Sequence, residues 1–336
     1  MDNPKLNNKS MNILFYGYGN HAKKIRQFAK KYLKIEGVEF NFFGIKRDLA
    51  ESTDLEIYST FEKCISNVQI DAAFIALPDE LHLTAFQECA RHQIAYIYVE
   101  KPAIGIEEYV RRHCDEIHRS LKFVQVGYHL RYSKPFVELR NMLRDEQMGK
   151  PLHFYSFSGK GLAFKPSYSE NWRSRRKRQI AETLSSHQVN LVKYLFDEFN
   201  EYFGDLKFTG EIKKSSQNKF WDTAIIHFTS SCSNFSGTLV SSWGSALHTS
   251  FSLISTSSRW EYDYKTVSLA RGCLSFDQNG YQIDVAPSKQ SCENNGLQAS
   301  IESFLRKALS GKRYDHQIND SEETYSIISR LDIAGS

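Results

Sequence analysis

The sequence predicts an α/β protein in which a doubly wound parallel sheet, extending to about residue 126, precedes a region with an antiparallel sheet. Near-continuous apolar runs alternate with helical stretches in the first part, as is typical of parallel strands covered on both faces. A glycine-rich turn follows the first run. Beyond residue 150, apolar and polar residues alternate instead, which indicates a sheet with one face buried and the other facing water or a partner subunit.

The predicted elements of the first part alternate regularly. Five strands are expected at NILFYG (12–17), VEFNFFGI (38–45), IDAAFIALP (70–78), IAYIYVEKP (94–102) and KFVQVGY (122–128). Helices are expected between them at 21–34, 61–67, 82–93 and 106–119. In the first helix, apolar residues recur at the spacing that places them on one helical face. A buried helix segment could explain one such run, but not the ordered alternation.

The second part contains β-prone segments rich in Ser, Thr and aromatic residues. Strands are expected at HFYSFSGKG (153–161), DTAIIHFTSSCS (222–233), SGTLVSSWGS (236–245) and SFSLISTSS (250–258). Helices are expected at 187–197, at 297–310 with a glycine following, and at 321–333. No internal repeat interrupts this order.

The bulk composition excludes several classes of protein. A net charge of +4 over 336 residues is too small for a dedicated nucleic-acid binder, although the run RSRRKR (173–178) is basic. The cysteines are scattered without metal-ligand spacing, so we expect neither a disulfide scaffold nor a metal site: Cys64, Cys89, Cys114, Cys232, Cys273 and Cys292. No signal-peptide pattern and no membrane-span-length apolar run occurs, and we therefore expect a soluble, cytoplasmic protein.

The turn after the first strand has the pattern GxGxxA and opens a helix. It consists of Gly17, Tyr18, Gly19, Asn20, His21 and Ala22. The first glycine permits the tight turn, the second lets a diphosphate approach the backbone, and the small alanine lets helix and strand pack closely. Because the turn follows a strand and opens a helix, we expect it to bind a dinucleotide. The alternative is a glycine turn without a ligand.

The end of the second strand favours NADP(H) over NAD(H). An NAD site usually has an acidic residue there, but Gly44 and Ile45 occupy the position. Lys46 and Arg47 follow and could bind a 2′-phosphate. NAD(H) remains possible, because Lys46 and Arg47 could be solvated and Asp48 could bind the ribose instead.

Five motifs in order resemble the Gfo/Idh/MocA oxidoreductases, the group of glucose–fructose oxidoreductase and inositol dehydrogenase. The motifs are GYGNHA (17–22), DAAFIALPDELH (71–82), YVEKPA (98–103), VGYHLRYSKP (126–135) and LSSHQVNLVKYLF (184–196). The resemblance implies a Rossmann domain over 1–126. It also implies a substrate-binding and oligomerisation domain over 127–336, with a large open, mostly antiparallel sheet and a last helix that could pack back on the Rossmann domain.

The resemblance further implies hydride transfer between a nicotinamide and a hydroxyl or keto carbon of a sugar, nucleotide-sugar or cyclitol. It implies a homodimer or homotetramer formed through the C-terminal sheet. By position in the motifs, the residues expected to contact the cofactor are Leu77, Pro78, His82, Glu100, Lys101 and Arg131. By the same comparison, those expected to contact the substrate are Lys101, Tyr128, Arg131, Thr183 and His187.

Two of these residues are the predicted catalytic groups. Oxidation of an alcohol removes a proton from oxygen, and histidine has the side-chain pKa nearest neutrality, which suits His187. A fixed positive charge stabilises the developing alkoxide, which suits Lys101. The alternatives are a helix-start histidine packed against the core and a solvated lysine at a strand end.

The motif around His187 departs from the family pattern. Thr183 stands where members usually carry an Asp before the histidine, and Asn190 replaces the later Asp. Glu182 could substitute for the first of these. The alternative function is therefore a cofactor-binding member without turnover, structural or regulatory.

The segment NWRSRRKR (171–178) is the most charged stretch of the chain. We expect Trp172, Arg173 and neighbouring arginines to hold an anionic substrate such as a nucleotide-linked or phosphorylated sugar. The alternative is a solvated loop.

Overall fold

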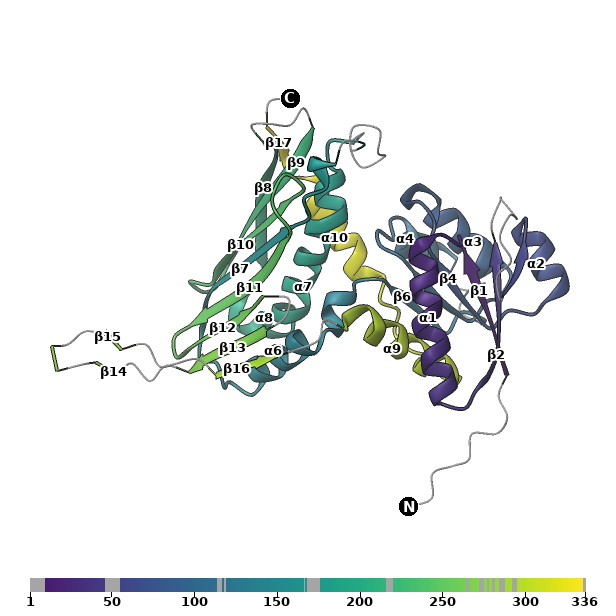
Figure 1. Ribbon diagram of the computed structural model, residues 1–336, viewed down its shortest axis with the longest axis horizontal. Helices are drawn as coiled ribbons and strands as arrows, with labels where there is room; N and C mark the ends of the chain where they lie inside the picture. Colours follow the sequence, from purple (N-terminus) through teal and green to yellow (C-terminus); the bar gives the residue numbers. More distant parts are fainter. Residues whose placement is uncertain are drawn as a thin grey trace, which may run out of the picture. The chain divides into compact units, whose positions relative to one another are not determined.

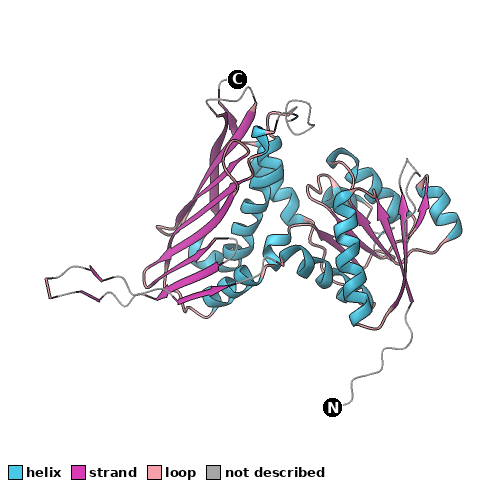
Figure 2. Ribbon diagram, in the orientation of Figure 1, coloured by secondary structure: helices cyan, strands magenta, loops and turns pink. Residues whose placement is uncertain are grey.

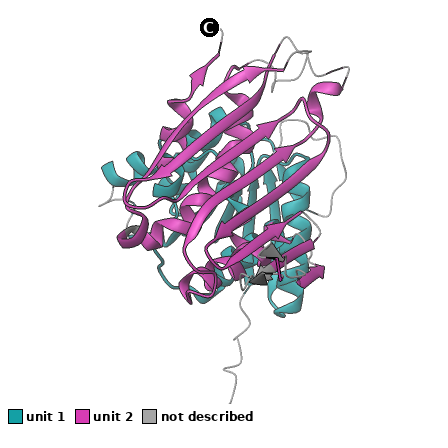
Figure 3. Cartoon of the chain, turned by 90° about the vertical axis from the view of Figure 1, so that its left-hand side faces the viewer, with its two compact units in different colours: residues 1–129, 297–322 teal, residues 130–296, 323–336 magenta. Residues whose placement is uncertain are grey.

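The chain divides into two compact units (Figure 3). The structure, a computed structural model, describes residues 10–45, 55–113, 117, 119–165, 167, 176–215, 220–263, 266–271, 275–276, 278–279, 282–283, 288–291 and 295–334. Unit 1 comprises residues 1–129 and 297–322, and unit 2 comprises residues 130–296 and 323–336. Residues 297–322, which the sequence assigned to the second domain, thus return to the first unit.

Unit 1 contains a six-stranded sheet in which all strands are parallel (Figure 1). Its order is β3-β2-β1-β4-β5-β6, so the direction of the winding reverses between β1 and β4. In such sheets, ligands bind outside the carboxyl ends of the strands at this reversal. The strands are β1 (Ser10–Tyr16), β2 (Glu39–Ile45), β3 (Glu56–Tyr58), β4 (Ala72–Ile75), β5 (Tyr96–Val99) and β6 (Phe123–Val126).

The helices of unit 1 cover this sheet because their apolar residues share one face. They are α1 (Asn20–Ile35), α2 (Phe61–Asn67), α3 (His82–Arg91) and α4 (Ile106–Arg112). In α1, Ala22, Ile25, Ala29 and Leu33 are all fully buried. Every residue of β4, β5 and β6 is buried as well, as expected for strands covered on both faces.

A distant segment completes the core of unit 1. Helix α9 (Gly296–Ser310) places Phe304 against Phe74 and Tyr98, with ring centroids 5.0 and 5.7 Å apart. The side-chain amide of Gln125, on β6, donates hydrogen bonds to the carbonyl and the hydroxyl of Ser300 on α9. This packing explains why residues 297–322 belong to the first unit.

Unit 2 contains a nine-stranded, mostly antiparallel sheet of order β16-β13-β12-β11-β7-β10-β9-β8-β17. Only the pairs β7–β10 and β8–β17 are parallel. The strands are β7 (Pro151–Gly159), β8 (Leu206–Lys214), β9 (Trp221–Ser230), β10 (Ser236–Ser242), β11 (His248–Ser255), β12 (Ser258–Tyr262), β13 (Thr266–Arg271), β16 (Ser288–Ser291) and β17 (Asp332–Ile333). A separate ribbon pairs β14 (Ser275–Phe276) with β15 (Gln282–Ile283). The predicted fold class is therefore confirmed.

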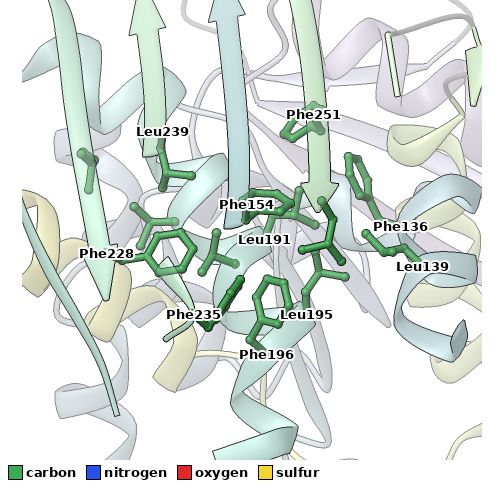
Figure 4. Close-up of a cluster of buried hydrophobic side chains, with 14 of the residues drawn as sticks. Phe136, Leu139, Phe154, Leu191, Leu195, Phe196, Phe228, Phe235, Leu239 and Phe251 are labelled. Carbon is green, nitrogen blue, oxygen red and sulfur yellow. The ribbon is translucent and has the colours of Figure 1, made fainter. Parts of the chain in front are cut away.

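Helices pack against one face of the large sheet (Figures 1 and 2). They are α6 (Lys134–Arg144), α7 (Ser186–Phe196), α8 (Asn200–Phe203) and the C-terminal part of α10 (Asn319–Ser329). Figure 4 shows the resulting core, in which aromatic rings from the strands meet apolar side chains of α7. Phe154 of β7 contacts Phe196 of α7 at 5.9 Å between ring centroids.

The opposite face of the sheet is turned toward the viewer in Figure 3. Successive side chains of a strand point to opposite faces, so alternate residues of the same strands point to this one. No helix among the described residues of unit 2 is drawn over it. Large apolar side chains on these strands are exposed, including Leu152, Tyr155 and Ile254 at 41%, 37% and 44% of their full surface. Alternation thus produces one dry face and one face available to water or a partner.

Candidate functional site

The turn after β1 requires glycine at its first position. Gly17 has φ of +89°, a conformation that side chains disfavour. A Cβ placed there would lie 2.7 Å from Leu77 Cδ2 and 2.8 Å from the carbonyl oxygen of Ala76. The turn after β1 therefore lies directly against the loop after β4, at the point where the winding of the sheet reverses.

Gly19, the second glycine of the turn, has open space beside its Cα. Gly19 precedes α1 with φ of −94°, and a Cβ added there would meet no atom of the described residues within 4 Å. No side chain caps the helix start, and its first turn contains no acidic residue. Backbone amides at a helix start carry partial positive charge, so this open flank fits an anionic diphosphate.

The remaining residues of the turn have different roles. Ala22 is fully buried, as predicted for close packing of helix and strand. Tyr18 is also buried, and its ring packs edge-on against Phe15 at 6.1 Å between centroids. The Tyr18 side chain thus belongs to the core, and a cofactor contact at this position would come from its main chain.

His82, predicted to line the cofactor, joins two loops. Its ring is 1% exposed, with Nδ1 2.8 Å from the carbonyl oxygen of Pro102 and Nε2 2.8 Å from that of Leu77. Both ring nitrogens are therefore engaged by main chain. His82 fixes the loop after β4 relative to the loop after β5.

Glu100 lies just beyond the carboxyl end of β5 and contacts the glycine-rich turn. Its carboxylate oxygen is 2.8 Å from His21 Nε2. Burial raises the pKa of Glu100, but the hydrogen bond and charge of His21, with the charges of His129 and Lys101, outweigh burial and lower the pKa overall. The same hydrogen bond raises the pKa of His21, against an opposing effect of burial.

A second set of contacts holds the loop after β5. The amide of Ala103 donates to Ser321 Oγ at 3.2 Å, and the amide of Gly105 donates to Glu322 Oε1 at 2.6 Å. Tyr128, predicted to contact the substrate, is 3% exposed, and its hydroxyl lies 3.4 Å from Ser321 Oγ. Sequence reasoning missed Ser321 and Glu322, because nothing in their local pattern indicates this distant partner.

In unit 2, Arg131 is buried and hydrogen-bonded to Asn190, the residue at the position of the later Asp in the resembling motif. Its Nε and Nη2 donate to Asn190 Oδ1 at 3.2 and 2.7 Å. The guanidinium also lies 5.5 Å from the centroid of the Tyr194 ring. Asn190 in turn donates to Thr324 Oγ1 at 3.5 Å. Thus Arg131 and Asn190 are brought together as one hydrogen-bonded group.

His187 lies in the first turn of α7, directly after a π-helical turn over Ala181–Ser185. Such turns are frequent at functional sites. Within this turn, the buried carboxylate of Glu182 is 3.0 Å from Arg176 Nη2, and Thr183 Oγ1 accepts from Gln179 Nε2 at 3.3 Å. Thr183, at the position of the first Asp, and Glu182, its candidate substitute, are therefore both engaged by neighbouring side chains.

The described residues of the basic segment, 176–178, make contacts within unit 2. Besides Arg176, Lys177 lies 5.0 Å from the centroid of the Trp221 ring. Arg178 donates to the carbonyl oxygens of Ile328 and Leu331 at 3.2 and 2.5 Å. The other residues predicted to bind ligands by charge lie outside the described residues: Lys46, Arg47, Trp172 and Arg173.

Lys101 belongs to unit 1 and His187 to unit 2, so their meeting at one substrate stays a prediction.

Across the described ranges, three or more His, Cys, Asp or Glu side chains are nowhere grouped so as to hold a metal ion. None of the helices in the described part of the chain is long and apolar enough to cross a membrane.

Comparisons with known proteins confirm the family resemblance for the first unit. Residues 11–128 match the model of an oxidoreductase family with an NAD-binding Rossmann fold, the Gfo/Idh/MocA family. An inositol 2-dehydrogenase of Rubrobacter xylanophilus is 22% identical over 183 residues, which are 54% of this chain and 49% of that protein. The chain thus spans about half the length of this curated relative.

Solved structures show the same fold over nearly the whole chain. Myo-inositol 2-dehydrogenase of Lactobacillus plantarum superposes with a TM-score of 0.72 at 13% identity, covering 96% of both chains. Levoglucosan dehydrogenase in complex with NADH and levoglucosan gives a TM-score of 0.75 at 12% identity, again covering 96% of both. These likenesses establish the two-unit architecture.

The two glycines of the turn should respond differently to alanine. Gly17→Ala should lower the free energy of unfolding by about 2–4 kcal/mol, because positive φ and close packing are both penalised. Gly19→Ala should cost no more than about 1 kcal/mol but weaken NADH binding roughly tenfold, because its methyl group enters the open flank. Urea unfolding and fluorescence titration with NADH measure both. Unchanged NADH affinity in a folded Gly19→Ala variant would contradict the assignment of this flank to the cofactor.

Proposed function

We propose that the chain is a nicotinamide-dependent oxidoreductase acting on a hydroxyl or keto carbon of a sugar, nucleotide-sugar or cyclitol, because residues 11–128 match the model of the Gfo/Idh/MocA oxidoreductase family. The glycine-rich turn carries the proposal, since Gly17 tolerates no side chain and Gly19 keeps its flank open. The names of the inositol and levoglucosan dehydrogenases support the substrate class. When bound, the nicotinamide supplies the hydride acceptor or donor.

The proposed roles of the side chains follow from the chemistry of alcohol oxidation. Backbone amides at the start of α1 hold the diphosphate, and the loop after β5 delivers Lys101 beside the reacting oxygen. The Lys101 ammonium stabilises negative charge developing on that oxygen. His187 exchanges the hydroxyl proton with solvent. Arg131, oriented by Asn190 and Tyr194, contacts the cofactor amide or the substrate.

The proposed cofactor is NADP(H) in preference to NAD(H). The support lies at the carboxyl end of β2, where a Cβ on Gly44 would lie 2.8 Å from Leu55 Cδ1 and Ile45 is buried. NAD sites usually have an acidic side chain there that bonds the ribose hydroxyls. Neither position 44 nor position 45 can present such a side chain. Against this preference, the family description names NAD and the levoglucosan dehydrogenase complex contains NADH.

The cofactor preference is tested by steady-state kinetics with one substrate and both reduced cofactors. We expect the Michaelis constant for NADPH to be at least roughly tenfold below that for NADH, because each lost charge-assisted hydrogen bond is worth about 1.5–3 kcal/mol. Equal constants would overturn the NADP preference while leaving the oxidoreductase proposal standing.

A second candidate function is cofactor binding without turnover. Two observations favour it: Arg131 binds the neutral amide of Asn190 at the later Asp position, and Glu182 is engaged by Arg176. At these two positions, therefore, one residue carries no carboxylate and the other has its carboxylate paired with an arginine. Stereospecific exchange of the nicotinamide C4 hydrogen with a panel of ketoses separates the two functions, because only turnover produces exchange.

The proposed catalytic pair is tested by substitution. Lys101→Met and His187→Gln should each lower kcat by about 10²–10⁴-fold, because each removes a group that stabilises the transition state. Cofactor affinity of His187→Gln should stay near that of the wild type. The matched controls are Lys63→Met and His92→Gln, exposed residues of α2 and of the turn after α3. Full activity in both active-site variants would refute the assignment.

We further propose that the open face of the large sheet pairs two copies of the chain into a homodimer or homotetramer. The exposed apolar side chains of Leu152, Tyr155 and Ile254 support this, because contiguous exposed apolar surface marks interaction sites. Charged residues lie beside these side chains on β12, where Arg259 pairs with Ile254 and Glu261 pairs with Ser252 of β11. A central apolar area with a polar rim is typical of protein interfaces.

Native mass spectrometry tests the assembly. The wild type should contain an even number of copies, and Tyr155→Asp with Ile254→Lys should weaken association by about tenfold or more, because each change buries an unpaired charge. Ile35→Lys on α1, exposed at 71%, is the matched control. A monomeric wild type at micromolar concentration, or a double variant with unchanged mass, would refute this interface.

A further inference from the structure

His21 and Glu100 form a contact that the proposed hydride transfer does not explain. We propose that they are positioning residues whose ion pair sets the affinity of the glycine-rich turn for the dinucleotide, so that cofactor binding weakens when His21 loses its proton. This inference rests on the proposed cofactor site. It goes beyond that site by assigning a protonation-dependent function to two side chains.

The pair joins two segments that both border the cofactor site. His21 is the second residue of α1 and follows Gly19 closely, whereas Glu100 immediately precedes Lys101. The two residues are 79 positions apart, and His21 Nε2 lies 2.8 Å from Glu100 Oε1. The Glu100 side chain is 14% exposed and that of His21 50%. A half-exposed imidazole can exchange its proton with water while its partner stays fixed.

Main-chain hydrogen bonds at the ends of the strands fix the position of Glu100. The amide of Glu100 donates to the carbonyl of Ile75 at 2.9 Å, and the amide of Gly127 donates to that of Val99 at 2.9 Å. A Cβ on Gly127 would lie 2.8 Å from Glu100 Oε2. The missing side chain of Gly127 therefore leaves room for the Glu100 carboxylate, which lies against the glycine-rich turn.

Several charged groups face the pair. Glu100 interacts with His21, His129 and Lys101, and His21 interacts with Glu100, Lys24 and Lys101. With His21 protonated, the Glu100 charge is balanced beside the amides that would hold the diphosphate. Loss of the His21 proton removes one positive charge there and leaves the carboxylate less compensated. The site then repels an anion more strongly.

The direction of the pH effect follows from the shifted pKa of His21. Hydrogen bonding to Glu100 raises this pKa in the folded chain. The pair therefore contributes its full stability below the unfolded value of about 6.5 and loses it as pH rises through the raised folded value. Dinucleotide affinity should fall over the same interval. Loss of the His21 charge, a few residues from the diphosphate and partly screened by solvent, should change the affinity about fivefold.

The test is the dissociation constant for NADH, measured by fluorescence with the full chain between pH 6 and 9. NADH is the probe because its diphosphate, unlike a 2′-phosphate, does not titrate in this range. The wild-type constant should rise about fivefold as pH rises. His21→Gln keeps a donor but cannot gain charge, so its constant should be high and independent of pH. His92→Gln is the control and should follow the wild type.

Glu100→Gln provides a second signature, because without the carboxylate the pKa of His21 should fall. The midpoint of the affinity curve, and of the His21 imidazole resonance in NMR spectra, should shift to lower pH. A wild-type chain that binds NADH with no pH dependence, or a His21→Gln variant that keeps the wild-type curve, overturns this inference alone. A wild-type chain that binds no dinucleotide at any pH overturns the proposed function as well.

Discussion

The contact between the turn after β1 and the loop after β4 is the constraint on which the candidate site depends. Gly17 touches Leu77 and Ala76 so closely that no Cβ fits between them. This contact occurs where the winding of the parallel sheet reverses, and α1 starts three residues after Gly17, at Asn20. His82 then joins the Leu77 loop to Pro102, and His21 joins α1 to Glu100. Three strand ends are thereby held in one arrangement.

The second unit is organised by a different constraint, the alternation of residues along its strands. Inward residues of the strands pack against the helices, Phe154 against Phe196 of α7 and Phe251 against Phe136 of α6. Outward residues such as Tyr155 and Ile254 remain exposed. The core of this unit supports α7, and α7 carries His187 in its first turn. The same sheet therefore supports the helix of a predicted catalytic residue on one side and leaves large apolar side chains exposed on the other.

Sequence patterns predicted the elements whose signals are local. The GxGxxA turn, the apolar runs of β4, β5 and β6, and helix α9 were all identified because spacing and composition suffice for them. Several strands escaped prediction. β3 has only three residues, the lysines and glycine of β8 obscure its alternation, and no strand was predicted after residue 258, although β12 to β17 lie there. The roles of Tyr128 and His82 in joining loops also escaped, since burial depends on distant partners. For the same reason, no local pattern indicated that Gly127 makes room for Glu100.

The central claim is that the carboxyl edge of the unit 1 sheet holds a nicotinamide dinucleotide. Hydrogen–deuterium exchange followed by mass spectrometry tests it directly, because bound diphosphate occupies the amides at the start of α1. Saturating NADPH should slow exchange in peptides covering residues 17–22 and 100–105 and leave peptides of the outer strand β12 unchanged. Protection confined to other segments, or absent from these two, would contradict the account.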